Sequence, residues 1–340
     1  MKYIGLDVHS RQCTYVIMGK SGRTLKQGSI PTQENELLTF VRSIRGKKKM
    51  VFEEGTLAQW MYVLLKNELD ELIVCQPMGK TGPKTDLIDA GELADLLRVG
   101  RLKSVFHSDN SLMFLRTLIA GYSDVIHEMT RAKNRYKALF RQVAIPATGT
   151  AFYKDKEKTS LLTVGNSRFV ATNLFNQIQF LEEQKLEYLK KFDANVKKYK
   201  PIKLLTSIPG IGVVRANQLV GIMVTPYRFP NKYHFFSYAM LTKHHQISDG
   251  KVYEKKRAHG QSELKAIFKS STLSAMQSKT SFRRKYDEMR LAGKDDRIAR
   301  NAVSKKIAAT VLGVWKSGKI YNDKYKEVTQ RLNKKCHSGT

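Results

Sequence analysis

Residues 84–90 constrain the fold of this chain most strongly, because they combine a helix start with two closely spaced carboxylates. Thr85 is a suitable N-cap, since its hydroxyl can accept from backbone N–H groups of the first turn. Asp86 and Asp89 lie three residues apart and therefore share one face of that turn. Apolar residues then recur at helical spacing and predict one buried face, at Leu87, Ala90, Leu93, Ala94 and Leu97. Acidic residues also favour helix starts for electrostatic reasons, so a structural role for the pair is the alternative.

Two further acids follow apolar runs that are typical of strands. Asp7 comes after Tyr3–Leu6, and Glu53 comes after Met50–Phe52. If these strands alternate with helices, all four carboxylates meet at one rim of a sheet, where their mutual repulsion calls for cations. Mg²⁺ prefers such hard oxygen ligands, and two ions can clamp the attacking and leaving oxygens of a phosphodiester. The sequence therefore predicts a site for Mg²⁺, with Mn²⁺ as the other candidate ion.

The charge of the chain indicates a polyanionic partner. Its 340 residues include 60 Lys and Arg against 30 Asp and Glu, a formal net charge of +30. About +3 of this charge lies on residues 1–110 and about +27 on residues 111–340. Nucleic acid is the usual partner of such an excess, and an anionic membrane surface is the alternative. We find no signal peptide and no apolar run that could span a bilayer, so we expect a protein without membrane segments.

The cysteines favour a reducing compartment. Cys13, Cys75 and Cys336 are widely spaced, and no CxxC pair occurs. This pattern argues against disulfides and structural zinc, so we expect a cytoplasmic protein.

Residues 1–108 predict an α/β domain with a mixed sheet. Strands are expected at residues 2–9, 12–18, 23–30, 50–53 and 72–76, and helices at residues 33–44, at 57–67 and after residue 84. Three hairpin strands followed by alternating helices and strands correspond to the ribonuclease-H type of layout.

Residues 109–200 predict long amphipathic helices. One is expected at residues 110–143, and a second carries the run from Leu174 to Tyr199. A helical hairpin or coiled coil and a helix packed within one bundle are both compatible with this pattern. Either arrangement can mediate self-association.

Residues 201–318 predict a mainly α-helical third domain, with helices at 262–279 and 296–316 and a basic tail at 319–340. Ser207–Gly212 resembles the hairpin of helix-hairpin-helix modules. There, Gly210 and Gly212 would let backbone N–H groups approach a DNA phosphate at a helix start. A plain glycine-rich helix entry is the alternative.

Ser248 stands beside a turn signal, Asp249–Gly250. A turn serine is more often structural than catalytic, so the local pattern leaves both roles open. Cationic residues that follow the turn are candidate nucleic-acid contacts, at Lys251, Lys255, Lys256 and Arg257.

Taken together, these motifs resemble the DEDD transposases of bacterial insertion elements, the insertion sequence 110 family. The resemblance spans nearly the whole chain and rests on residues 5–8, 51–55, 84–90, 208–212 and 248–251, with Gly260 and Leu264 downstream. Ile247 and Asp249 stand where the family commonly has a serine and a glycine, and Lys265 stands where arginine is frequent.

The resemblance implies a RuvC-like first domain whose four acids bind Mg²⁺. They correspond to Asp7, Glu53, Asp86 and Asp89, and the adjoining Glu54 is the alternative second acid. It also implies a C-terminal transposase domain in which Ser248 is the nucleophile and forms a covalent link to DNA. Family members act on donor and target DNA under guidance from a bridge RNA. They assemble as dimers to tetramers, in which the acids of one protomer meet the serine of another.

Two other functions remain open at this stage. A metal-dependent endonuclease of the Holliday-junction-resolvase type would use water in place of Ser248. A non-enzymatic nucleic-acid-binding protein would use its acids structurally.

Overall fold

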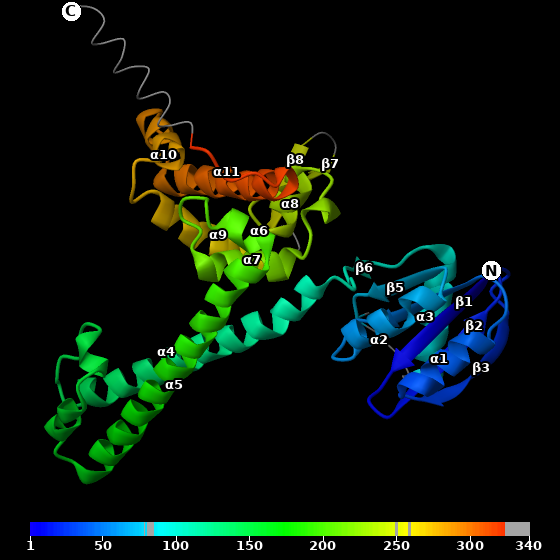
Figure 1. Ribbon diagram of the computed structural model, residues 1–340, viewed down its shortest axis with the longest axis horizontal. Helices are drawn as coiled ribbons and strands as arrows, with labels where there is room; N and C mark the ends of the chain where they lie inside the picture. The colour runs from blue at the N-terminus through cyan, green and yellow to red at the C-terminus, as the bar shows by residue number, and fades with distance from the viewer. Residues whose placement is uncertain (78, 80–84, 249–250, 258–259, 324–340) are drawn as a thin grey trace, which may run out of the picture. The chain divides into compact units, whose positions relative to one another are not determined.

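The computed structural model of the chain describes residues 1–77, 79, 85–248, 251–257 and 260–323 (Figure 1). For residues 244–248 and 252–257 only the backbone is described. The chain divides into two compact units, Met1–Asn110 and Ser111–Thr340. Lys84, Asp249 and Gly250, which the sequence motifs include, lie outside the described residues, as does most of the predicted tail.

The first unit contains a mixed sheet with the strand order β3-β2-β1-β4-β5-β6. Its strands are β1 (Lys2–Val8), β2 (Gln12–Met18), β3 (Thr24–Pro31), β4 (Lys48–Glu53), β5 (Glu71–Cys75) and β6 (Ser104–Val105). β1, β2 and β3 form antiparallel hairpins, whereas β4 runs parallel to β1 and β5 runs parallel to β4. The predicted α/β layout of the N-terminal domain is confirmed, and the strand order is consistent with a ribonuclease-H type of sheet.

Helices cover both faces of this sheet. α1 (Glu34–Ser43) and α2 (Ala58–Leu65) share one apolar core with the side chains of Ile4, Leu6 and Phe52. α3 (Asp86–Val99) packs on the other face, where Val51 and Cys75 contact Leu93 and Leu97. Because side chains alternate along a strand, Asp7 and Glu53 lie on the face that α3 covers.

The contact between α3 and β1 is close because β1 carries a glycine there. A Cβ built on Gly5 would lie 2.0 Å from the carbonyl oxygen of Ala90 and 2.5 Å from the amide nitrogen of Ala94. Only glycine permits this approach, which brings the start of α3 to the carboxyl end of β1.

The second unit begins with two long helices that pack side by side. α4 (Leu115–Arg141) follows a short 3₁₀ turn, and α5 (Gly165–Lys198) runs alongside it (Figure 1). Tyr136 and Phe140 of α4 pack against Phe175 of α5 and Phe152 of the connecting segment. The long helices expected in residues 109–200 are present, and their role as a coiled coil stays a prediction.

The rest of the second unit is mostly helical. It contains α6 (Lys200–Leu205), α7 (Val213–Met223), α8 (Lys232–Tyr238), α9 (Ser262–Ala275), α10 (Ser281–Leu291) and α11 (Asp296–Ser317). The structure adds one feature that the sequence did not predict, a hairpin of β7 (Lys243–Ser248) and β8 (Lys251–Arg257). Charged and polar residues on both strands hide the apolar alternation by which strands are recognised. Within the described residues, no helix is long and apolar enough to cross a membrane.

Candidate functional site

Asp7 and Glu53 lie at neighbouring strand ends. Parallel pairing of β1 with β4 places Leu6 beside Phe52, and Asp7 and Glu53 are the next residue of each strand. Both side chains are partly buried. The carboxyl ends of parallel strands share one edge of the sheet, so the register puts the two acids at the same level of that edge, as predicted from the sequence.

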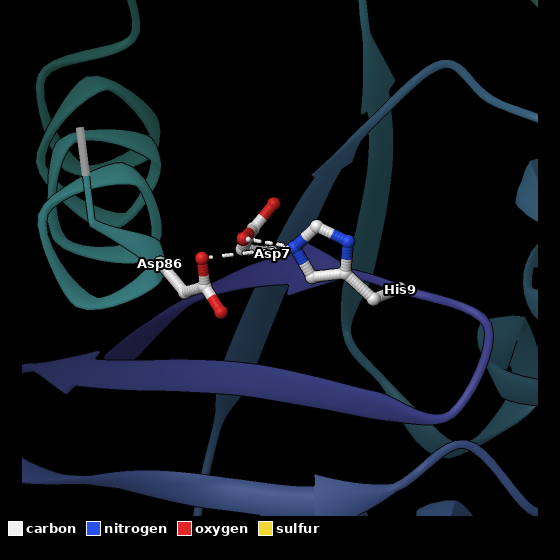
Figure 2. A group of neighbouring side chains, drawn as sticks. All are labelled: Asp7, His9 and Asp86. Carbon is white, nitrogen blue, oxygen red and sulfur yellow. Dashed lines mark hydrogen bonds and ion pairs between the residues drawn. The ribbon is translucent and has the colours of Figure 1, made fainter.

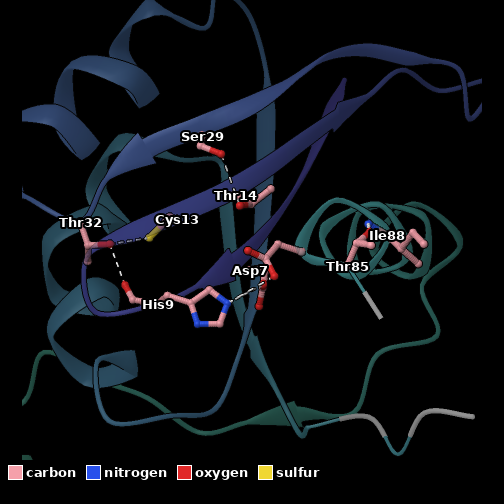
Figure 3. A network of polar contacts seen from close by, with 9 residues as sticks. Asp7, His9, Cys13, Thr14, Ser29, Thr32, Thr85 and Ile88 are labelled. Atoms are coloured by element: carbon pink, nitrogen blue, oxygen red, sulfur yellow. Dashed lines mark hydrogen bonds and ion pairs between the residues drawn. The ribbon is translucent and has the colours of Figure 1, made fainter. Parts of the chain in front are cut away.

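The helix start supplies Asp86. Thr85 is the N-cap of α3, and its Oγ1 accepts a hydrogen bond of 3.3 Å from the backbone N–H of Ile88 (Figure 3). The predicted cap is therefore confirmed. Asp86 and Asp89 lie in the first turn, with Asp86 exposed and Asp89 partly buried.

Asp7 and Asp86 converge on one histidine. His9 Nε2 lies 3.0 Å from Asp7 Oδ2 and 3.7 Å from Asp86 Oδ1 (Figure 2). The ligand atoms of these three residues all lie within 4.8 Å of one another, a spacing at which they could hold a metal ion. Carboxylate oxygens from a strand end and a helix start therefore fit a divalent cation.

The structure distinguishes the two adjacent glutamates. Glu54 Oε2 lies 2.6 Å from His107 Nε2, and the other ring nitrogen of His107 lies 2.8 Å from Gln59 Oε1. The His107 ring is buried, so Glu54 is part of a packed polar contact. Glu53 instead lies two residues after Val51 in β4 and therefore on the same face of the sheet, which α3 covers.

The acids also influence two buried thiols. Burial, followed by the negative charge of Glu53, raises the pKa of Cys75 to about 11. Burial likewise raises the pKa of Cys13, and Asp7 adds to that effect. Both thiols stay protonated near neutral pH and act as core residues.

A polar cavity of about 550 Å³ adjoins Asp86. Its lining comes from the β2–β3 hairpin and the start of α3, at Gln12, Thr14, Gln27, Gly28, Ser29, Thr85, Asp86 and Leu87. Thr14 is paired with Asp7 across β1 and β2, and its Oγ1 lies 3.4 Å from Ser29 Oγ (Figure 3). The cavity thus continues directly from the acidic edge and offers uncharged hydrogen-bonding groups.

The two predicted glycines of the second unit have different surroundings. Gly210 has φ +85°, and a Cβ there would lie 2.3 Å from the carbonyl oxygen of Ser271 in α9. Gly212 is the N-cap of α7, and apart from its chain neighbours no described residue lies within 4 Å of its Cβ position. A cavity of about 360 Å³ opens beside them, and Arg215, which lines it, donates to the Gly210 carbonyl at 2.8 Å. Close packing against α9 and a positive φ therefore both require glycine at position 210, and the contact of Gly210 and Gly212 with nucleic acid stays a prediction.

Ser248 is the last residue of β7, and its backbone pairs with Lys251, the first residue of β8. Lys251 is exposed. Lys255, Lys256 and Arg257 follow along the same strand. The hairpin places the serine and the cationic residues on two adjacent strands of the second unit.

Comparison with known families decides the identity of the chain. A DEDD transposase model of the IS110 type matches residues 4–145, which include the acidic edge of the sheet. A second model, described as the transposase IS116/IS110/IS902 family, matches residues 202–287, which include the Gly210 turn and the β7–β8 hairpin. No curated protein matches the chain.

The chain belongs to the IS110 family of transposases. This transposase is therefore a DNA recombinase, and the non-enzymatic alternative does not apply. Its substrates are DNA, and a DEDD-type domain indicates dependence on a divalent metal.

His9 of the transposase did not figure in the prediction from sequence. Its signal was available, because His9 lies two residues after Asp7 at a strand end, and alternate residues of an extended strand point the same way. A lone histidine is a weak signal, however, and only the folded α3 brings Asp86 next to it.

Proposed function

We propose that Asp7, Glu53, Asp86 and Asp89 together bind the divalent ions of the transposase, either Mg²⁺ or Mn²⁺. The observation that carries the proposal is the convergence of Asp7 and Asp86 from separate elements on one point. Bound ions would polarise the scissile phosphate and lower the charge that resists attack on it. The contact between Glu54 and His107 favours Glu53 as the second acid.

The polar cavity beside Asp86 is the place we propose for the DNA strand that enters this site. Gln12 and Ser29 are exposed there and offer uncharged groups, which can contact sugar and phosphate oxygens without competing for the metal.

Ser248 is the nucleophile in this proposal. Its Oγ attacks phosphorus and gives up its proton, a deoxyribose hydroxyl leaves, and the DNA stays joined to the serine through a phosphodiester. Attack by a deoxyribose hydroxyl on that link reverses the step and frees the serine, so rejoining needs no external energy source. The position of Ser248 at the end of β7, beside the cationic strand β8, supports access to a phosphate backbone.

A bridge RNA and self-association complete the proposal. Residues 111–340 carry about +27, which suits RNA and DNA bound together, with base pairing to read the target. The packed pair α4 and α5 is the element that we propose for assembly of dimers to tetramers as a coiled coil. In such an assembly, Ser248 of one protomer can reach the acids of another.

A covalent trapping assay tests the chemistry. The full-length transposase is mixed with its bridge RNA, donor DNA, target DNA and Mg²⁺, denatured, and separated to detect a protein–DNA adduct. We expect Ser248→Ala and Asp86→Asn to abolish the adduct. Asp95→Asn is the matched control, because Asp95 lies on the same helix and pairs with Arg98, which is on that helix as well.

Glu53→Gln and Glu54→Gln separate the two adjacent acids in the same assay. We expect the adduct to be lost in the first variant and retained in the second, because Glu54 contacts His107. DNA cleavage that proceeds without an adduct, and that Ser248→Ala leaves unchanged, would contradict the serine mechanism and support the resolvase-like alternative with water as the nucleophile.

A further inference from the structure

His9 lies beside the carboxylates of Asp7 and Asp86 and contacts both. Its Nε2 is 3.0 Å from Asp7 Oδ2 and 3.7 Å from Asp86 Oδ1, and Figure 2 shows this ring nitrogen turned towards both carboxylates. The His9 side chain is 59 % exposed and the Asp86 side chain 60 % exposed. Solvent and ions can therefore reach the group formed by Asp7, His9 and Asp86.

The backbone of His9 is held in place. Thr32, just beyond β3, donates its Oγ1 hydrogen to the His9 carbonyl at 2.7 Å (Figure 3). The Thr32 amide donates to the Arg11 carbonyl at 3.0 Å. These bonds tie the β1–β2 connection to the end of β3. The imidazole is thus presented from a fixed backbone, as a metal-binding side chain should be.

The spacing of the donor atoms fits shared coordination. Two neighbouring ligands of an octahedral ion, each roughly 2.1 Å from the metal, lie about 3.0 Å apart. His9 Nε2 and Asp7 Oδ2 are in hydrogen-bond contact at 3.0 Å, a separation that two neighbouring ligands of one ion can also have, and the ligand atoms of Asp7, His9 and Asp86 all lie within 4.8 Å of one another.

We infer that His9 is a direct metal ligand of this transposase, through Nε2, and that the site therefore favours Mn²⁺ over Mg²⁺. This inference rests on the proposed function, because it assumes that Asp7 and Asp86 bind the same ion. Imidazole nitrogen is a ligand for transition metals, whereas Mg²⁺ binds almost entirely through oxygen. A nitrogen donor among the carboxylates stabilises bound Mn²⁺ and contributes little to bound Mg²⁺.

Pulsed electron paramagnetic resonance on the Mn²⁺-loaded full-length protein tests this assignment without any reaction. A histidine bound to Mn²⁺ modulates the electron-spin echo through its coordinated ¹⁴N nucleus. We expect this modulation in the wild type and its loss in His9→Gln, together with an approximately tenfold or greater weakening of Mn²⁺ binding. Mg²⁺ binding, measured by calorimetry, should stay nearly unchanged. His234→Gln is the matched control, because His234 is exposed and bonds to Asn231 in the second unit.

The outcomes separate this inference from the proposed function. Mn²⁺ bound without ¹⁴N modulation, or modulation that persists in His9→Gln, would overturn the role of His9 while leaving the carboxylate site intact. Asp7→Asn should abolish Mn²⁺ binding altogether. If Asp7→Asn binds Mn²⁺ as the wild type does, the metal site is elsewhere, and both the inference and the proposed function are wrong at this position.

Discussion

Replacement of Gly5 by alanine would test how the packing of α3 on β1 maintains the acidic site. The new Cβ would lie 2.0 Å from the Ala90 carbonyl oxygen and 2.5 Å from the Ala94 amide nitrogen. Both atoms belong to the helix backbone, so neither can rotate away as a side chain can. To regain a contact of 3.4 Å, α3 has to retreat from β1 by roughly 1.4 Å.

The expected effect on stability follows from this overlap. Overpacking of a core costs about 1–3 kcal/mol, and alanine regains at most about 1 kcal/mol by restricting the unfolded chain. We therefore expect Gly5→Ala to lower the free energy of unfolding by about 1–2 kcal/mol. The same retreat carries Asp86 away from Asp7, and a displacement of about 1 Å at a reacting centre can lower a rate by about 100-fold. The rate of DNA cleavage by Gly5→Ala should therefore fall by about 100-fold, even though most of the protein stays folded.

Two assays on the same preparations test this prediction. Urea unfolding followed by circular dichroism measures stability, and adduct formation with saturating metal measures DNA cleavage. Gly91→Ala is the matched control, because Gly91 lies on α3 and, among the described residues beyond its own turn of helix, its Cβ would meet Met18 Cε alone, at 4.0 Å. Alanine at a helical glycine should stabilise by about 0.5–1 kcal/mol and leave cleavage unchanged. Equal stability and equal cleavage in Gly5→Ala and the wild type would refute the argument that close packing of α3 positions Asp86.

Three further predictions concern substitutions of single residues. Thr85→Ala removes the N-cap of α3 and should destabilise the protein by about 1 kcal/mol in thermal unfolding, whereas Thr85→Ser should retain the cap. Gly210→Ala should lower the melting temperature even without nucleic acid, because a Cβ would meet the Ser271 carbonyl and the backbone has φ +85°; unchanged stability would contradict the packing role. Burial raises the pKa of Tyr136 to about 12, and its hydroxyl has no hydrogen-bond partner among the described residues. Tyr136→Phe should therefore stabilise by about 1 kcal/mol near neutral pH. The tyrosine ionises near pH 10 in the unfolded chain, so the raised pKa in the folded chain costs the wild type no stability below that pH and lowers its free energy of unfolding as the pH rises from 10 towards 12. Urea titrations across this window should show a smaller decrease for Tyr136→Phe than for the wild type.

Much of the first unit could be predicted because its signals are local. The strand of Asp7 was expected at residues 2–9 and is found at Lys2–Val8, and the cap at Thr85 was read from its position before an apolar repeat. The β7–β8 hairpin was missed, since Lys and His residues along it obscure the alternation that identifies a strand. Its turn signal, Asp249–Gly250, was the one local indication of that hairpin.

The local sequence determines that carboxylates lie at two strand ends and at a helix start. Capping and apolar periodicity depend only on residues a few positions apart, so these positions could be predicted from the sequence. The tertiary structure decided which of these groups meet. The β1–β4 register sets Asp7 level with Glu53, Gly5 allows α3 to bring Asp86 to the same edge, and His107 engages Glu54. The simultaneous contact of His9 with Asp7 and Asp86 also depends on the tertiary structure. Each of these contacts joins residues that are far apart in the chain or on separate elements, so it depends on strand register and helix packing, which no short stretch of sequence encodes.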